Sequence, residues 1–226
     1  MAGKRGKART DGGGTGEDAP SDPPLTRERI VATAVDLLDA EGIGGLTMRR
    51  LADRLGAGVM SLYWHVENKD DVLALALDTV LAYRPPASTD VPADWRGQVV
   101  HLLEDWRVAM LRHPWAATLL PRQPLGRNAL DRLERLSRTL SEAGVADDDL
   151  NAAIWSLWNS VMGATVTRAS YDRSAEDRAA AQRRLEDPSG QHPTIERSRL
   201  LLDDDWDGVF RRGIGFLLDG LSRRPR

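Results

Sequence analysis

Apolar residues recur three and four positions apart through most of the chain, which is the spacing of one face of an α-helix. In the first such stretch the stripe consists of Ile30, Ala34, Leu37 and Leu38, and glycines beyond position 41 end it. No segment alternates with the two-residue period of a β-strand over more than a few residues. The pattern therefore predicts an all-α protein whose first helix covers residues 26–41.

Glycine, proline and capping residues divide the remaining helical pattern into separate elements. The helices expected after the first are Met48–Leu55, Gly58–Trp64, Lys69–Tyr83, Trp95–Arg112, Trp115–Leu120, Asn128–Ala143, 147–171, 194–202 and 205–221. The expected apolar stripe of the helix 128–143 consists of Leu130, Leu133, Leu136 and Leu140. Residues 173–186 are polar and only weakly amphipathic, and we expect a loop over 187–192.

Composition and two adjacent prolines divide the chain into a tail and two helical domains. Residues 1–24 mix basic and acidic side chains with many Gly and Pro and almost no large apolar residues, a composition typical of disorder. Pro85 and Pro86 cannot continue the helix before them. We therefore expect a first domain over 25–84 and a larger second domain over 92–222.

The stretch 46–77 contains two short predicted helices joined by a tight glycine turn. Thr47 suits the N-cap of the first helix, and Gly56 ends it. The second helix, residues 58–64, is too short to be stable in water by itself, so the helices on either side must hold it. Asn68 suits the N-cap of the helix that follows. Two helices joined in this way form a helix-turn-helix, whose second helix enters the major groove of DNA.

Side chains on and around that second helix combine base-reading with phosphate-binding chemistry. Residues near its start can reach base edges and thymine methyl groups, while hydroxyl, indole and imidazole donors follow at Tyr63, Trp64 and His65. Helix starts that carry Arg or Lys are themselves phosphate sites. The candidate DNA contacts are Thr47, Arg49, Arg50, Val59, Met60, Ser61, Tyr63, Trp64, His65 and Lys69. Taken singly, Val59 could equally belong to the core and Tyr63 to ordinary packing, but the neighbouring indole, imidazole and basic groups favour DNA.

A resemblance to the DNA-binding domain of the tetracycline-repressor (TetR) family of bacterial regulators is carried by the run LTMRRLADRLGAGVMSLYWHVENKDDVLALAL, with the signature LYWHVENKDDVLAL. The resemblance implies base or near-base contacts for Arg49, Val59, Met60, Ser61 and Tyr63. It implies phosphate contacts for Thr47, Trp64, His65 and Lys69. Gly58, Val59 and Met60 are less polar than the residues often found there, which leaves the operator sequence open.

Two predicted helices are apolar around most of their circumference, namely the one near 150–171 and the last one near 205–221. Such helices must be covered on nearly all sides, and Gly213, Gly215 and Gly220 would let another backbone come close. We therefore expect a homodimer through these two helices, as the resemblance also implies. A two-fold dimer places two recognition helices about one DNA turn apart, or somewhat more, so the operator should be a pseudo-palindrome.

The segments LRHPWAATLLPRQPLGRNALDRLERL and AIWSLWNSVMG resemble the C-terminal domain of the tetracycline-type branch of the family. This implies a pocket for a small-molecule effector that alters the spacing of the DNA-binding domains through the helix starting at Lys69. The candidate pocket residues, apolar with a few polar groups, are Trp106, Met110, Trp155, Trp158, Asn159, Met162 and Arg168. Because the chain has seven tryptophans and two phenylalanines, we expect a planar, fairly apolar effector, although for any single tryptophan ordinary core or interface packing is the favoured interpretation.

Composition limits the functions open to the chain. Its net charge is −3, so binding to nucleic acid needs a local basic face rather than overall charge. It contains no cysteine, which excludes disulfides and thiol chemistry. The apolar runs are too short for a membrane span, and the N-terminus lacks the apolar stretch of a signal peptide. We therefore expect a cytoplasmic protein.

An enzymatic or metal-dependent function has little support in the sequence. There is no paired-histidine motif and no Gly-rich phosphate loop of recognisable form. His101 and His113 are not four positions apart and have no evident acidic partner nearby, so we expect no metal site and no cofactor. Two interpretations remain. One is a ligand-responsive regulator, a repressor as the resemblance implies, and the other is a constitutive or protein-controlled DNA-binding regulator whose C-terminal domain only dimerises.

Overall fold

A computed structural model describes residues 24–83, 92–171, 176, 179–180, 182–183, 193–198 and 205–222, and every regular element in these ranges is helical. The elements are α1 Arg27–Gly45, α2 Met48–Leu55, α3 Val59–Leu62, α4 Lys69–Val80, α5 Trp95–Arg112, α6 Pro114–Leu119, the 3₁₀ turn η1 Leu120–Arg122, α7 Arg127–Glu142, α8 Asp147–Tyr171, α10 Pro193–Ser198 and α11 Trp206–Ser222. The all-α prediction is confirmed. None of the described helices has the length and apolar composition that crossing a bilayer requires.

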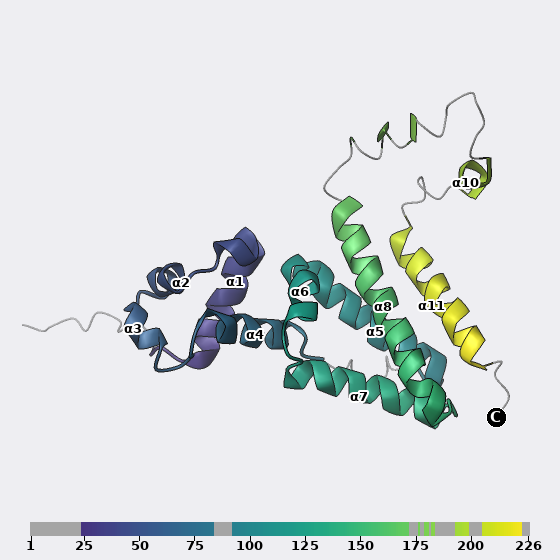
Figure 1. Cartoon of the computed structure of the whole chain (residues 1–226), viewed down its shortest axis with the longest axis horizontal. Helices are drawn as coiled ribbons and strands as arrows, with labels where there is room; N and C mark the ends of the chain where they lie inside the picture. The colour runs from purple at the N-terminus through teal and green to yellow at the C-terminus, as the bar shows by residue number, and fades with distance from the viewer. Residues whose placement is uncertain are drawn as a thin grey trace, which may run out of the picture.

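Two groups of helices lie at opposite ends of the molecule (Figure 1). We call α1 to α4 the head, and α5 to α8 together with α11 the body. Within the head α4 packs against α1, and it also packs against α6 and α7 of the body. Because α1 contacts α6 as well, the head is attached to the body through two of its helices, α1 and α4.

Several helix ends differ from the prediction. The second helix of the helix-turn-helix ends at Leu62 rather than Trp64, because the chain turns at 63–65 with the amide of His65 donating to the carbonyl of Leu62 at 2.9 Å. The next helix ends at Val80 rather than Tyr83. The predictions for 1–23 and 187–192 lie outside the described residues, as does most of 173–186.

The first helix is interrupted at Gly42 but continues to Gly45. Gly42 has φ +70°, in the left-handed region that favours glycine, so the regular hydrogen-bonding pattern breaks where the first helix was expected to stop. The chain then makes one more turn before Leu46. The predicted stripe from Ile30 to Leu38 is fully buried.

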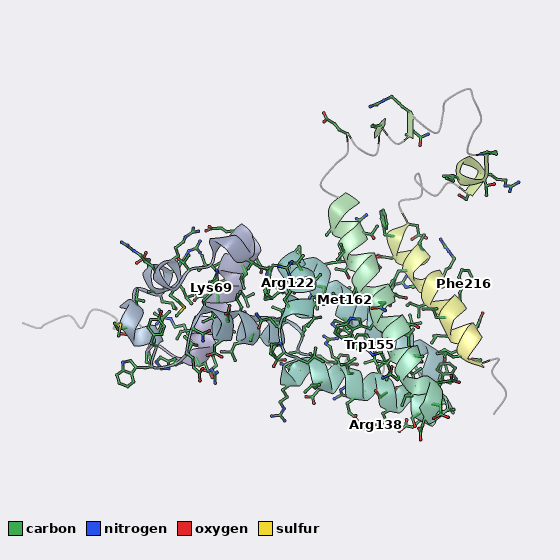
Figure 2. All side chains as sticks on the ribbon, viewed as in Figure 1. Lys69, Arg122, Arg138, Trp155, Met162 and Phe216 are labelled. Carbon is green, nitrogen blue, oxygen red and sulfur yellow. The ribbon has the colours of Figure 1, made fainter. Side chains whose placement is uncertain are left out.

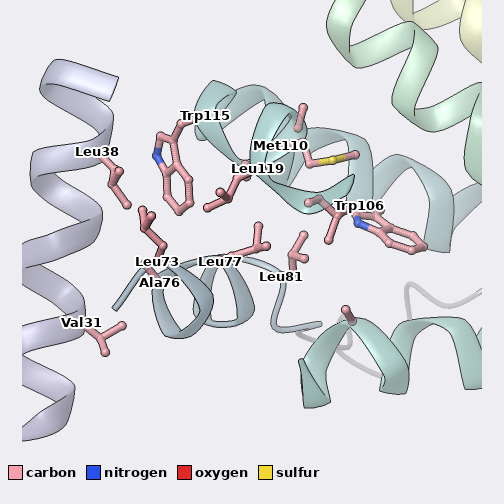
Figure 3. Packing of buried hydrophobic residues seen from close by; sticks show 14 of the residues in the cluster. Val31, Leu38, Leu73, Ala76, Leu77, Leu81, Trp106, Met110, Trp115 and Leu119 are labelled. Carbon is pink, nitrogen blue, oxygen red and sulfur yellow. The ribbon is translucent and has the colours of Figure 1, made fainter. Parts of the chain in front are cut away.

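Buried apolar side chains connect the head to the body. Figure 3 shows the ring of Trp115, from α6, between α1 and α4 near Leu38 and Leu73. Trp115 also donates its indole N–H to a carboxylate oxygen of Asp39 on α1, at 2.6 Å. The contact between head and body is therefore part of a continuous apolar core with polar anchors, rather than a hinge of loops.

The buried face of α7 agrees with the predicted leucine stripe except at its first position. Leu130 is 52% exposed, while Ala129, Arg132, Leu136 and Leu140 are buried. The predicted stripe was therefore correct at Leu136 and Leu140, held in part at Leu133, which packs partly buried against the core, and was wrong at Leu130. The physical reason is that a buried guanidinium, that of Arg132, holds the inward position in the first half of the helix.

Candidate nucleic-acid interface and aromatic cluster

The two helices of the helix-turn-helix are held by local caps and by the core. Thr47 accepts a hydrogen bond from the amide of Arg50 at 3.2 Å, as its predicted N-cap role requires. Gly56 ends α2 with φ +63°, a conformation that residues with a Cβ rarely adopt. Leu51 and Leu62 are completely buried, so the four-residue helix α3 is held against the head by its one inward side chain and its neighbours.

Large side chains on and just after α3 point away from the core. Met60 is 76% exposed, Trp64 is 88% exposed, and Tyr63 is also exposed. Ser61 is exposed beside them, whereas Val59 is partly buried and packs against the core. Four of the predicted contacts, Met60, Ser61, Tyr63 and Trp64, are thus exposed. The partial burial of Val59 is compatible with both of its interpretations, a DNA contact and a core residue.

The basic candidates fall into two groups. Arg49 is exposed and makes no ion pair among the described residues. Arg50 instead pairs with Glu41 and donates to the carbonyl of Gly45 at 3.0 Å, which fixes the start of α2 to the end of α1. Lys69 is half-buried with its Nζ 3.4 Å from the carbonyl of Ile43. Arg49 is therefore the more available of the two arginines for a phosphate.

The start of α4 is fixed by the predicted N-cap, Asn68, together with Asp71, and we call these two residues the capping pair. The side chain of Asn68 accepts from the amide of Asp71 at 2.9 Å, and the carboxylate of Asp71 accepts from the amide of Glu67 at 3.0 Å. Arg27 of α1 lies 3.6 Å from the same carboxylate. These contacts join α4 to the turn that carries the half-buried His65, so a displacement of α4 displaces the exposed surface as well.

Three of the predicted pocket residues meet in the body, and we call Trp106, Trp155 and Trp158 the aromatic cluster. The rings of Trp106 and Trp158 are 4.5 Å apart and nearly perpendicular, and those of Trp155 and Trp158 are 6.1 Å apart. Trp106 is buried, while Trp155 is 55% exposed and lies at the outer edge. Met110 is buried and Met162 packs partly buried against the same core; Figure 2 labels Trp155 and Met162 on α8.

The remaining two pocket candidates are an exposed residue and a distant one. Asn159 is exposed. The guanidinium of Arg168 lies 5.6 Å above the ring of Trp206 on α11. Because ten residues of helix span about 15 Å, Arg168 is far along α8 from Trp158. The structure therefore does not bring Arg168 to the aromatic cluster.

Polar groups around the cluster include several that sequence reasoning missed. Trp106 Nε1 and His101 Nε2 are buried and have no hydrogen-bond partner among the described residues. Tyr83 lies edge-on to His101, with ring centroids 6.4 Å apart. The guanidinium of Arg132 lies 5.6 Å from the ring of Tyr83 and 5.9 Å from that of Trp106. A charged residue within the leucine-rich helix 128–143 was the only signal that could have pointed to Arg132.

The environment of His113 corrects an expectation. The sequence showed no acidic partner nearby, but the carboxylate of Asp39, 74 positions earlier in the chain, lies 2.8 Å from His113 Nδ1. The same carboxylate accepts the indole N–H of Trp115. Within the described residues, no three side chains of the metal-binding types gather into a group that could hold an ion. His113 is thus part of the attachment between head and body.

The outer face of α8 and α11 carries apolar residues that the described part of the chain leaves exposed. In α11, Phe210, Ile214 and Leu218 are buried against the body, whereas Phe216 is 75% exposed (Figure 2). A Cβ added at Gly163 or Gly213 would meet nothing within 4 Å. Between the two helices lies an open groove of about 240 Å³ that includes Leu157 and Leu217.

A further open groove, of about 410 Å³, lies between the head and the body beside their contact. Helices α1, α4, α5 and α7 line it, and its wall includes Asp36, Arg112 and Arg132. A third groove, of about 320 Å³, lies between α5 and α11 beside the ion pair of Arg107 with Asp207. These grooves are outside the aromatic cluster.

A helix-turn-helix with an exposed second helix, mounted on a separate helical body, defines a transcriptional regulator of the DNA-binding class. Comparison with known families then places the chain: residues 30–76 match "Bacterial regulatory proteins, tetR family" and residues 88–224 match "Tetracyclin repressor-like, C-terminal domain". The chain belongs to the TetR family of transcriptional regulators, which are not enzymes.

Individual relatives agree with this assignment. The chain is 38% identical over 204 residues to an HTH-type transcriptional regulator of Saccharopolyspora erythraea, covering 88% of this chain and 86% of that one. It is 34% identical to the HTH-type transcriptional repressor DrrR1 of Streptomyces coeruleorubidus, with 88% and 78% covered. Among solved structures, ActR of Streptomyces coelicolor in complex with actinorhodin is 30% identical, with a TM-score of 0.74 and 88% and 98% covered.

Proposed function

We propose that this regulator is a ligand-responsive repressor, which binds a pseudo-palindromic operator as a homodimer and is released by a planar, largely apolar effector. The observation that carries the proposal is the buried indole N–H of Trp106 in the aromatic cluster, which has no hydrogen-bond partner among the described residues. The same chain exposes Met60, Ser61, Tyr63 and Trp64 on and after α3, which we call the DNA-facing surface. A buried donor without an acceptor costs about 1–3 kcal/mol. A bound molecule that supplied an acceptor would remove this cost.

The exposed surface around α3 supports the DNA-binding part of the proposal. Exposed large apolar groups close together in the chain often mark a surface that a partner covers, and Met60, Tyr63 and Trp64 are three such residues within five positions. Arg49 adds an exposed positive charge at the start of α2. We assign base or near-base contacts to Arg49, Val59, Met60, Ser61 and Tyr63. We assign phosphate contacts to Thr47, Trp64, His65 and Lys69.

The uncovered face of α8 and α11 supports a homodimer. Phe216 and the glycine positions on this face leave an apolar surface that a second copy of the same two helices would cover. Two copies of the DNA-facing surface would then be related by a two-fold axis, which is why the operator is expected to be a pseudo-palindrome.

The aromatic cluster supports the effector class. Offset and edge-to-face rings offer broad apolar surfaces, and the few polar groups near them can fix a ligand's orientation. The solved complex of ActR holds actinorhodin, and that protein resembles this chain over most of both lengths. The competing interpretation is a constitutive regulator, and the close packing of Trp106 on Trp158 is the observation that favours it.

The first experiment selects duplexes from random DNA with the purified protein and measures the selected operator by fluorescence anisotropy at physiological salt. Met60→Ala should weaken binding, because Met60 is 76% exposed on α3 and its side chain is accessible to DNA. Leu130→Ala is the matched control, since Leu130 is also exposed but lies on α7. If both variants bind as wild type does, the DNA-facing surface has been placed wrongly.

The second experiment adds planar polycyclic aromatic compounds, including actinorhodin, to the protein–operator complex. The proposal expects release by at least one compound and a weaker response in Trp106→Phe, which removes the indole N–H but keeps an aromatic ring. Tight operator binding that no compound releases would favour the constitutive regulator. A protein that selects no DNA sequence at all would overturn both interpretations.

A further inference from the structure

Arg132 of α7 reaches three other elements from a buried position. Its side chain is only 3% exposed. The guanidinium forms an ion pair with Asp105 of α5 at 2.7 Å. It also donates to the carbonyl of Leu81 and, at 3.3 Å, to that of Ala82, both at the C-terminal end of α4. A buried arginine whose donors serve helix-end carbonyls complements the negative end of the helix dipole.

A second contact between the two helices runs from α4 to α7: Asp78 of α4 contacts the start of α7. The residue before α7, Gly126, has no side chain that could cap the helix, and Asp78 of α4 takes this role. Its Oδ1 accepts from the amide of Asn128 at 2.8 Å, and its backbone carbonyl accepts from the Asn128 side chain at 2.9 Å. A carboxylate at the start of a helix is favourable for the same electrostatic reason.

These two contacts form what we call the α4–α7 junction: Asp78 with the start of α7, and Arg132 with the end of α4. They are one helical turn apart on α4, so they fix both the position and the rotation of its end. The other end of α4 carries the capping pair that joins it to the DNA-facing turn. The whole α4 helix, Lys69–Val80, is short and regular, so its two ends move together.

The same guanidinium borders the aromatic cluster. It lies 5.9 Å from the ring of Trp106, and its ion-pair partner Asp105 is the residue before Trp106 on α5. Burial lowers the pKa of Arg132 while Asp105 raises it, but a guanidinium stays charged near neutral pH. Because Asp105 is next to Trp106 on α5, a movement of that turn of α5 also moves Asp105. Loss of its partner would leave a buried charge uncompensated at large cost, so Arg132 is expected to follow Asp105.

We propose that Arg132 is the positioning residue that couples the aromatic cluster to α4. The inference rests on the proposed function, because it assigns the aromatic cluster to the effector. A molecule that displaces Trp106 shifts the Arg132–Asp105 pair, the carbonyls of Leu81 and Ala82 lose or change their donor, and the end of α4 moves. Coupling of this kind is reciprocal, so operator binding must in turn alter the surroundings of Trp106.

Reciprocity allows a test without knowledge of the effector. The full-length protein is labelled with 5-fluorotryptophan, the ¹⁹F resonance of Trp106 is assigned with Trp106→Phe, and the spectrum is recorded with and without the operator that the wild type selects. We expect the Trp106 resonance to shift on operator binding. In Arg132→Lys, which keeps the charge but not the forked donors, the shift should fall at least twofold. In Arg138→Lys, on the exposed face of the same helix, the shift should remain.

The inference is overturned if operator binding leaves the Trp106 resonance of the wild type unchanged. It is also overturned if Arg132→Lys binds the operator and shows the full shift. Should Arg132→Lys fail to fold, Gly126→Ala provides a second variant, because it displaces Asp78 without touching Arg132 or the aromatic cluster. Gly126→Ala should also reduce the shift, and a full shift in it counts against the inference.

A DNA-free measurement separates this inference from the proposed function. Hydrogen exchange in the free protein reports the amides of Leu81 and Ala82, which donate to carbonyls within the last turn of α4. Exchange there should become several-fold faster in Arg132→Lys and stay the same in Arg138→Lys. If no operator is selected, the proposed function fails while this measurement still decides whether Arg132 holds α4; equal exchange in both variants would refute that role.

Discussion

Gly126→Ala should destabilise the protein although the backbone at this position accepts alanine. Gly126 has φ −73° and ψ 175°, which is ordinary extended backbone. A Cβ added there would lie 2.8 Å from the Cβ of Asp78 and closer still to its Cγ and Oδ1. The carboxylate must therefore leave the start of α7, and the amides of Asn128 and Ala129 lose their acceptor.

Loss of one helix cap sets the magnitude. Removing an N-cap side chain costs about 0.5–2 kcal/mol, and the cap here joins two helices from the head and the body, so we expect about 1–2 kcal/mol. The assay is urea unfolding followed by tryptophan fluorescence at one fixed protein concentration, because a dimer's stability depends on concentration. Gly44→Ala is the control: a Cβ at Gly44 would meet nothing within 4 Å, and its stability should equal or exceed that of the wild type.

The reasoning fails if Gly126→Ala unfolds at the same urea concentration as the wild type. A double-mutant cycle sharpens the test. In an Asp78→Ala background two of the three closest atoms are gone, so the cost of adding the methyl group at position 126 should shrink. An unchanged cost in that background would show that the clash is not with the capping carboxylate.

Three further changes test other surfaces. Trp64→Ala should change the free energy of unfolding by less than about 0.5 kcal/mol, because the side chain is 88% exposed, yet lower operator affinity about tenfold or more; a large loss of stability would show it to be packing. Phe216→Asp should give a helical monomer in sedimentation analysis, and a persistent dimer would move the interface elsewhere. The Arg107 guanidinium holds the pKa of Asp207 below its ordinary value of 3.8, so the stabilisation by this pair is complete above that value and is lost as the pH falls through the lowered pKa. Asp207→Asn should remove this small contribution to acid unfolding, and identical acid unfolding profiles would exclude it.

Local signals account for the elements that were predicted best. The helix Met48–Leu55 is bounded by Thr47 and Gly56, whose effects depend on residues within one turn, and both caps form as expected. The helix Trp95–Arg112 also has its predicted bounds, set by Asp94 and by the proline after His113. Where a boundary depended on longer-range packing, as at the end of α4, the prediction ran past it.

The sequence did not show that Arg132 faces inward on α7, nor which of the predicted pocket residues meet in the aromatic cluster. Both depend on contacts between distant parts of the chain. Leucine spacing predicts which face of a helix is buried. It cannot show that a carboxylate and two carbonyls from distant parts of the chain make an inward-facing arginine favourable. The tryptophans of the aromatic cluster come from two helices whose packing brings them together. Arg168 was chosen for its chemistry, but it lies too far along α8 from Trp158. Apolar periodicity shows which face of a helix a residue occupies, but it does not show which residues of a neighbouring helix lie at the same level.

Polar contacts at two places constrain how the head can move relative to the body. Asp39 of α1 holds both His113 and Trp115, and the α4–α7 junction holds the other helix. The groove of about 410 Å³ lies between these two attachments and is lined by helices from both groups. A tilt of the head that narrows or widens this groove must stretch one attachment or the other, since they lie on different helices. Of the two, only the α4–α7 junction borders the aromatic cluster, so under the proposed coupling a change at the cluster would reach the head through α4 rather than through α1.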